Sequence, residues 1–100
     1  MATINWTDEA LWWLDEIYNY IAQDNPTAAY KTIQGIYDRV QILQTFPEIG
    51  HAYPNLKDRN VRMLLYGHYR IAYLIKSENV IDILGIFHGS LDINRFLMKD

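Results

Sequence analysis

The chain has 100 residues, of which 50% are hydrophobic and 21% charged, a size and composition that fit one globular domain over residues 1–100 and exclude a disordered chain. It has no cysteine, which excludes disulfides and thiolate metal sites, and no apolar run near the roughly 20 residues of a membrane span. Because its first residues do not resemble a signal peptide, we expect a cytoplasmic protein.

The net charge of −3 is unevenly divided along the chain. Residues 1–50 hold two basic and seven acidic side chains, whereas residues 51–100 hold seven basic and five acidic ones. This division predicts an electropositive surface on an otherwise acidic body.

The first half predicts a short strand followed by a helical hairpin. Residues 3–6 form the strand, and Thr7 then caps a helix that runs to about Ala22. Within that helix Trp12 and Trp13 cannot both point inward, because neighbouring helical residues lie about 100° apart.

Asn25 and Pro26 open a second helix, which continues to Phe46-Pro47. The short connection makes the two helices antiparallel, and residues 47–60 read as a loop.

Three β-branched and aromatic runs predict an antiparallel meander at residues 61–66, 69–76 and 80–87. Gly67-His68 suits a two-residue turn and residues 77–79 a three-residue turn. The predicted class is α+β: an N-terminal strand, an antiparallel helical hairpin over one sheet face, and a mainly antiparallel three-strand meander. The last strand is apolar on both faces, as a central strand should be.

Turn length decides whether Arg70 and His88 form a catalytic pair. The first turn places Arg62 opposite Tyr73. A three-residue second turn places Arg70 opposite Ile86, on the same face as His88, whereas a two-residue turn places it opposite Phe87, on the other face. On one face, the guanidinium would neutralise a phosphate and the imidazole would move a proton.

Other sites are less defined. Lys57, Arg59 and Arg62 lie close together and are candidates for phosphate contacts, with plain solvation as the alternative. His51, His68 and His88 share no metal-ligand spacing, so we expect no metal and no cofactor.

The chain resembles the RelE/ParE toxin superfamily along nearly its whole length. The matching pieces are residues 20–29 (YIAQDNPTAA), 43–50 (LQTFPEIG), Arg62, 69–73 (YRIAY) and 83–89 (ILGIFHG). The resemblance implies a cytoplasmic toxin that a cognate antitoxin binds and masks, in a possible toxin–antitoxin hetero-oligomer. It also implies one of two targets: DNA gyrase for ParE-like members, or mRNA on the ribosome for RelE-like endoribonucleases, which need no metal.

For a RelE-like enzyme, the resemblance implies that Arg70 and His88 are catalytic, with Glu48 as the base. The helical signature and the His88-Gly89 ending favour the ParE branch, as does the lack of several lysines near the site. That branch often carries an arginine where this chain has Leu91, and Arg95 is the candidate substitute. A degenerate member that only binds its antitoxin is the remaining alternative.

We therefore predict a ParE-like gyrase poison with Arg59, Arg62 and Arg95 as target-binding residues. The predicted antitoxin-binding residues are Trp12, Trp13, Phe96 and Leu97, because large apolar side chains outside a core mark partner surfaces. The apolar residues of the tail have a second interpretation, as a structural cap on the sheet.

Overall fold

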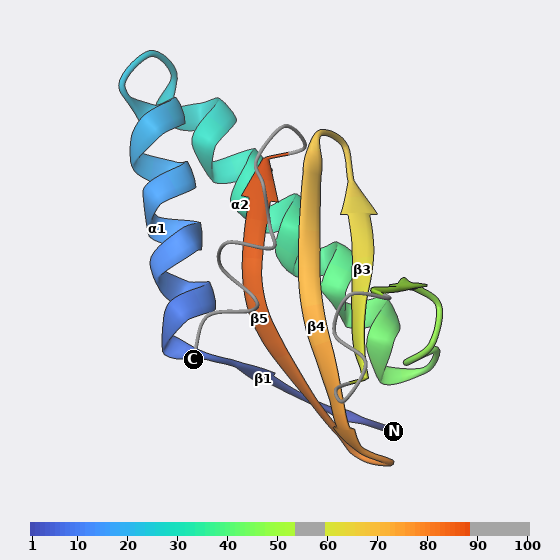
Figure 1. The fold of residues 1–100 in the computed structure, drawn as a ribbon. Coiled ribbons are helices and arrows are strands. Elements are labelled where there is room, and N and C mark those ends of the chain that lie inside the picture. The colour runs from blue at the N-terminus through green and yellow to red at the C-terminus, as the bar shows by residue number, and fades with distance from the viewer. Residues whose placement is uncertain (54–59, 89–100) are drawn as a thin grey trace.

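The computed structural model describes residues 1–53 and 60–88, which form a five-stranded sheet with a helical hairpin against it (Figure 1). In chain order the elements are β1 (Thr3–Trp6), α1 (Asp8–Ala22), α2 (Pro26–Val40), the 3-10 turn η1 (Gln41–Gln44), β2 (His51–Ala52), β3 (Val61–Tyr66), β4 (Tyr69–Ser77) and β5 (Val80–His88). The predicted α+β class and its order of elements are confirmed.

Both helices begin at the predicted caps. The Thr7 hydroxyl accepts a hydrogen bond from the N–H of Ala10 at 3.1 Å. The Asn25 side chain accepts one from the N–H of Ala28 at 3.0 Å, and Pro26 is the first residue of α2. Each cap satisfies a backbone donor that has no partner within the helix.

The prediction that the second helix reaches Phe46-Pro47 is wrong, because α2 ends at Val40 and the chain tightens into η1. Leu43 in η1 is fully buried. The apolar spacing of the sequence therefore continues after the α-helix has ended, and spacing alone cannot distinguish the tighter turn.

The strand order in the sheet is β1-β5-β4-β3-β2, which confirms that β5 is a central strand. β1 pairs in parallel with the first half of β5, from Thr3 opposite Val80 to Trp6 opposite Ile83, and the other pairs are antiparallel. β2 was assigned to a loop by the sequence, and that assignment is wrong. Two residues are too few to show the alternation that identifies a strand.

The turn between β4 and β5 has two residues, so the predicted three-residue turn is wrong. Ser77 faces Val80, and a register shift at Lys76 then places Ile75 opposite Ile81. A second shift, at Leu84 in β5, cancels the first one, so that Arg70 faces Phe87.

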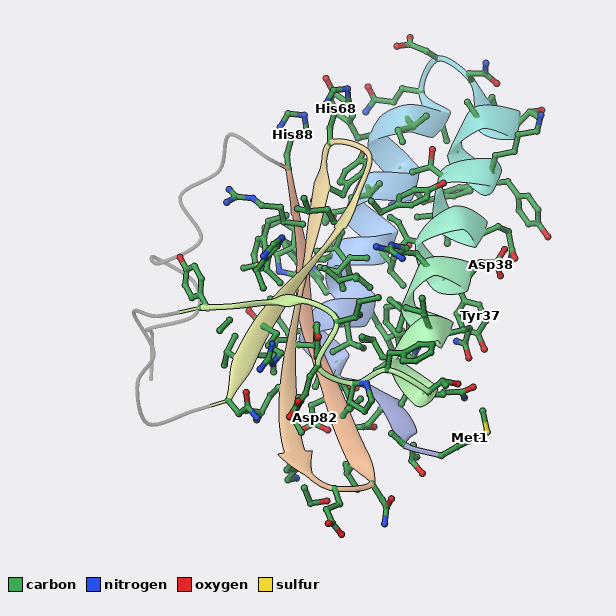
Figure 2. All side chains as sticks on the ribbon, turned by 90° about the vertical axis from the view of Figure 1, so that its right-hand side faces the viewer. Met1, Tyr37, Asp38, His68, Asp82 and His88 are labelled. Carbon is green, nitrogen blue, oxygen red and sulfur yellow. The ribbon has the colours of Figure 1, made fainter. Side chains whose placement is uncertain are left out.

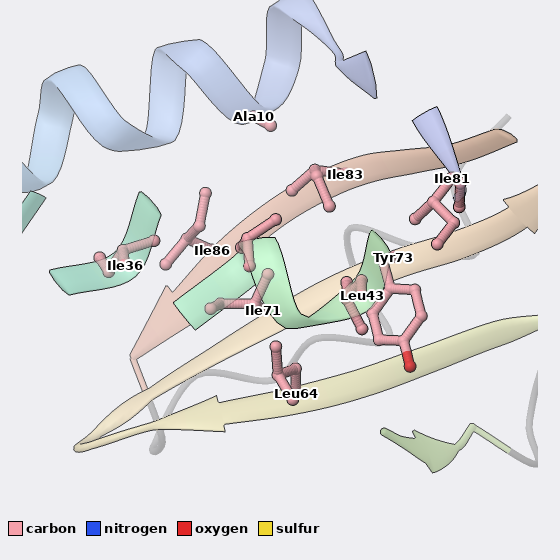
Figure 3. Close-up of a cluster of buried hydrophobic side chains, with 11 residues drawn as sticks. Ala10, Ile36, Leu43, Leu64, Ile71, Tyr73, Ile81, Ile83 and Ile86 are labelled. Carbon is pink, nitrogen blue, oxygen red and sulfur yellow. The ribbon is translucent and has the colours of Figure 1, made fainter. Parts of the chain in front are cut away.

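The sheet is apolar on both faces. On the face covered by the hairpin, which we call the helix-side face, fully buried side chains of the sheet meet those of α2 and η1 (Figure 3): Ile36, Val40, Leu43, Leu64, Ile71, Tyr73, Ile81, Ile83 and Ile86. A smaller cluster occupies the other side, the far face: Val61, Met63, Ala72 and Phe87. The helix-side core fixes the sheet against the hairpin and so positions the sites described next.

Candidate functional site

The structure places the predicted catalytic residues apart. Arg70 faces Phe87 and belongs to the far face, whereas His88 faces Tyr69 and belongs to the helix-side face. Glu48 lines a pocket together with Ile75, towards the other end of β4. The shared face that the three-residue turn predicted for Arg70 and His88 is therefore wrong, and the alternative two-residue register is the one observed. The catalytic roles themselves stay a prediction.

Arg62 and Tyr73 anchor the segment between η1 and β2. They face each other across β3 and β4, as predicted. Nη1 of Arg62 donates to the carbonyl of Glu48 at 3.0 Å and to that of Gly50 at 2.8 Å. Arg62 was predicted to bind the target; its guanidinium contacts backbone here, and the binding role stays a prediction.

The Tyr73 hydroxyl completes this anchor from within the core. It donates to the carbonyl of Pro47 at 2.7 Å and accepts from the N–H of Gly50 at 2.9 Å. A Cβ at position 50 would lie 2.6 Å from that hydroxyl oxygen and 2.8 Å from the carbonyl oxygen of Met63, so the close approach requires glycine.

Two tyrosines, the fully buried Tyr73 and the partly buried Tyr69, give stability a pH dependence. Burial raises the pKa of Tyr69 above its ordinary 10.0, and Tyr20 raises it further. Burial also raises the pKa of Tyr73, against the smaller lowering effects of Gly50 and Arg62. The folded state then keeps protons that the unfolded chain releases, so stability present below about pH 10 is lost as pH rises through the folded pKa values.

We expect the free energy of unfolding, measured with urea, to fall above about pH 10. Tyr73→Phe should make this decline shallower, because one of the two groups is removed. Tyr30→Phe is the control, since it removes the same hydroxyl from a side chain that is 60% exposed. Equal slopes in wild type and Tyr73→Phe would contradict the assignment.

The two adjacent tryptophans differ in burial, which confirms that they do not both point inward. Trp12 is 53% exposed. Trp13 is partly buried against Phe87, with ring centroids 5.0 Å apart, and also contacts Trp12 edge to face at 4.9 Å. The other predicted site residues, Arg59, Arg95, Phe96 and Leu97, lie outside the described residues.

A groove that the sequence did not predict lies between α1 and the end of β5. We call it the α1–β5 groove; it encloses about 520 Å³ and is lined by Trp13, Glu16, Ile17, Tyr20, Tyr69, Ile86 and His88. His68 stands beside His88 at this end of the sheet, with ring centroids 6.2 Å apart (Figure 2). No sequence signal identifies the groove, because it joins α1 to the β4–β5 hairpin, which is distant from α1 in the chain.

Residues 1–53 and 60–88 contain neither a candidate metal site nor a candidate membrane-spanning helix. No three histidine or acidic side chains there lie close enough to hold a metal ion. No helix in the same residues is both long and apolar enough to cross a membrane.

Comparisons with known proteins agree on one family. A family model described as the ParE toxin of the type II toxin–antitoxin system parDE matches residues 4–93. The chain is also similar to a solved structure described as the chromosomal ParDE toxin–antitoxin system from P. aeruginosa. The two share 30% identity with a TM-score of 0.73, over 88% of this chain and 96% of that one. No curated protein matched.

Proposed function

The chain belongs to the ParE toxin family and is the ParE-like toxin of a type II toxin–antitoxin system, and from this premise we propose that it acts by binding and poisoning DNA gyrase. The proposal also includes a cytoplasmic location and a cognate antitoxin that binds the toxin in a hetero-oligomer. The similar solved structure, which is described as a toxin–antitoxin system, supports that partner.

The observation that carries the choice of target is the separation of Arg70 from His88. Cleavage of RNA by this pair needs the guanidinium and the imidazole to reach the same phosphodiester. The two residues lie on opposite faces of the sheet, with Arg70 beside Phe87 and His88 beside Tyr69. This arrangement favours a binding function over the endoribonuclease alternative.

The test is inducible expression in a bacterium, with DNA and protein synthesis followed by pulse labelling. We expect DNA synthesis to stop first, with filamentation, and coexpression of the antitoxin to restore growth. Purified gyrase should lose supercoiling activity in the presence of the chain. Early loss of protein synthesis with cut mRNA would instead support the endoribonuclease, and no toxicity would support the degenerate member.

His88→Ala separates the two targets within the same assay. His88 is exposed at the end of β5, so the variant should fold. A gyrase poison should still stop DNA synthesis, because the proposed function assigns no proton transfer to His88. An endoribonuclease that uses His88 should lose activity by about 10²-fold or more, the usual contribution of an acid–base side chain.

A further inference from the structure

The α1–β5 groove is shaped to hold a long side chain. α1 supplies one wall through Trp13, Ile17 and Tyr20, and the strand ends supply the other through Tyr69 and Ile86. The Trp13 ring is fixed by its contact with Phe87, at 5.0 Å between centroids. The lining of the groove is therefore mainly aromatic and aliphatic.

The charge beside the groove is negative. Glu16 is the acidic residue of its lining, which contains no lysine or arginine among the described residues. α1 as a whole carries four carboxylates, Asp8, Glu9, Asp15 and Glu16, and no basic residue. A positively charged occupant would meet a complementary wall, whereas an acidic one would be repelled.

Two tyrosines, Tyr20 and Tyr69, line the groove. Tyr20 is 76% exposed although it lines the groove, so its ring is accessible from solvent. Tyr69 lies near enough for Tyr20 to affect its ionisation. Aromatic faces with a nearby carboxylate attract a guanidinium more than an ammonium, because the planar guanidinium also stacks on rings.

The groove can be reached by an extended partner chain. The ladder between β1 and β5 ends at Ile83, where the Thr7 hydroxyl donates to the carbonyl of Ile83 at 2.6 Å. Beyond this point, among residues 1–53 and 60–88, α1 and no strand lies beside this side of β5 (Figure 1). A segment that follows this side of β5 would direct side chains into the groove.

We propose that the α1–β5 groove receives an arginine side chain of the antitoxin, with its guanidinium against the Glu16 carboxylate and the Tyr20 ring. The aliphatic part of the arginine lies along Ile17 and Ile86, which gives the site both an apolar and a charged component. This inference rests on the proposed antitoxin partner and adds the chemistry by which that partner is recognised.

The first experiment needs no antitoxin. The full chain, made by cell-free synthesis with ¹⁵N label, is titrated with N-acetyl-arginine amide and followed by NMR. We expect millimolar binding with shifts at Tyr20, Tyr69 and His88, and no such shifts with the neutral isostere N-acetyl-citrulline amide. Shifts elsewhere only, or equal shifts with both compounds, would overturn the inference.

Glu16→Gln should weaken the arginine amide about fivefold, the upper size of a partly exposed ion pair. Glu9→Gln is the matched control, because it makes the same change on the same helix outside the groove lining. Tyr20→Phe should retain binding and Tyr20→Ala should lose it, since the ring face makes the contact.

The second experiment repeats these variants with the antitoxin. Glu16→Gln should raise the dissociation constant about fivefold, mainly through faster dissociation, while Glu9→Gln leaves it unchanged. If Glu16→Gln weakens the arginine amide but not the antitoxin, the occupant is another chain and the inference is overturned. Wild-type protein that binds the arginine amide but no antitoxin would contradict the proposed function instead.

Discussion

Replacing Tyr73 with alanine should lower the free energy of unfolding by about 4 kcal/mol, within the range for large buried aromatic side chains. Tyr73 is fully buried in β4 and belongs to the helix-side core (Figure 3). Its removal leaves a cavity between Leu43 and the sheet and also frees the segment at residues 47–50. For a domain with a total stability of about 5–15 kcal/mol, this loss is severe.

Tyr73→Phe separates the hydroxyl from the ring. The ring stays packed, but the buried N–H of Gly50 loses its acceptor and the carbonyl of Pro47 loses its donor. We expect a loss of about 1–2 kcal/mol, because an unsatisfied buried backbone group costs about that much. Urea denaturation followed by circular dichroism measures both variants.

Tyr30→Phe provides the matched control, since it removes a hydroxyl from a side chain that is 60% exposed. Its free energy of unfolding should stay within about 0.5 kcal/mol of wild type. If Tyr73→Phe were equally neutral, the hydroxyl would not anchor the segment before β2, and the role assigned to it would be wrong.

The fold could be predicted from the sequence because its signals are local. Thr7 and Asn25-Pro26 mark the helix starts through short-range hydrogen bonds. The Gly67-His68 turn fixes the pairing of β3 with β4 over its full length, including Arg62 opposite Tyr73. Each of these signals needs only a few neighbouring residues, and tertiary contacts did not overrule them.

The sequence could not decide whether Arg70 and His88 share a face of the sheet, because that depends on the register of β4 and β5. The pairing shifts by one residue at Lys76 and again at Leu84, and the residue types at these positions do not predict either shift. In the middle of the ladder the pairing is the one that a three-residue turn would give, with Tyr73 opposite Ile83. The second shift restores the pairing of a two-residue turn, so that Arg70 faces Phe87. Because side chains alternate, that one residue moves Arg70 from one face to the other.

The charged residues of the two halves of the chain differ in what they face. The electropositive surface that the sequence indicated in the second half stays a prediction. Among the described residues, Arg62 donates to backbone carbonyls and Lys76 lies 3.9 Å from Asp82. In the first half, Glu16 of α1 lines a mainly apolar groove. A sequence gives the number of charges, whereas their function depends on what each one faces.

Trp13→Ala should destabilise the fold by about 2–3 kcal/mol, somewhat less than for a fully buried aromatic residue. Trp13 is partly buried, packs against both core clusters and touches Phe87. Trp12→Ala should cost less than about 1 kcal/mol, since Trp12 is 53% exposed and its ring contact is with Trp13. Denaturation in urea measures the difference between these two neighbours.

Binding to the antitoxin should rank the two variants differently. An exposed tryptophan on an acidic helix has the character of an interface anchor, so we propose that Trp12→Ala weakens antitoxin binding about tenfold or more while the toxin stays folded. Trp13→Ala should affect binding through the altered groove and the lower stability together. An unchanged dissociation constant for Trp12→Ala would remove Trp12 from the partner surface, and the antitoxin would then contact α1 through the groove alone.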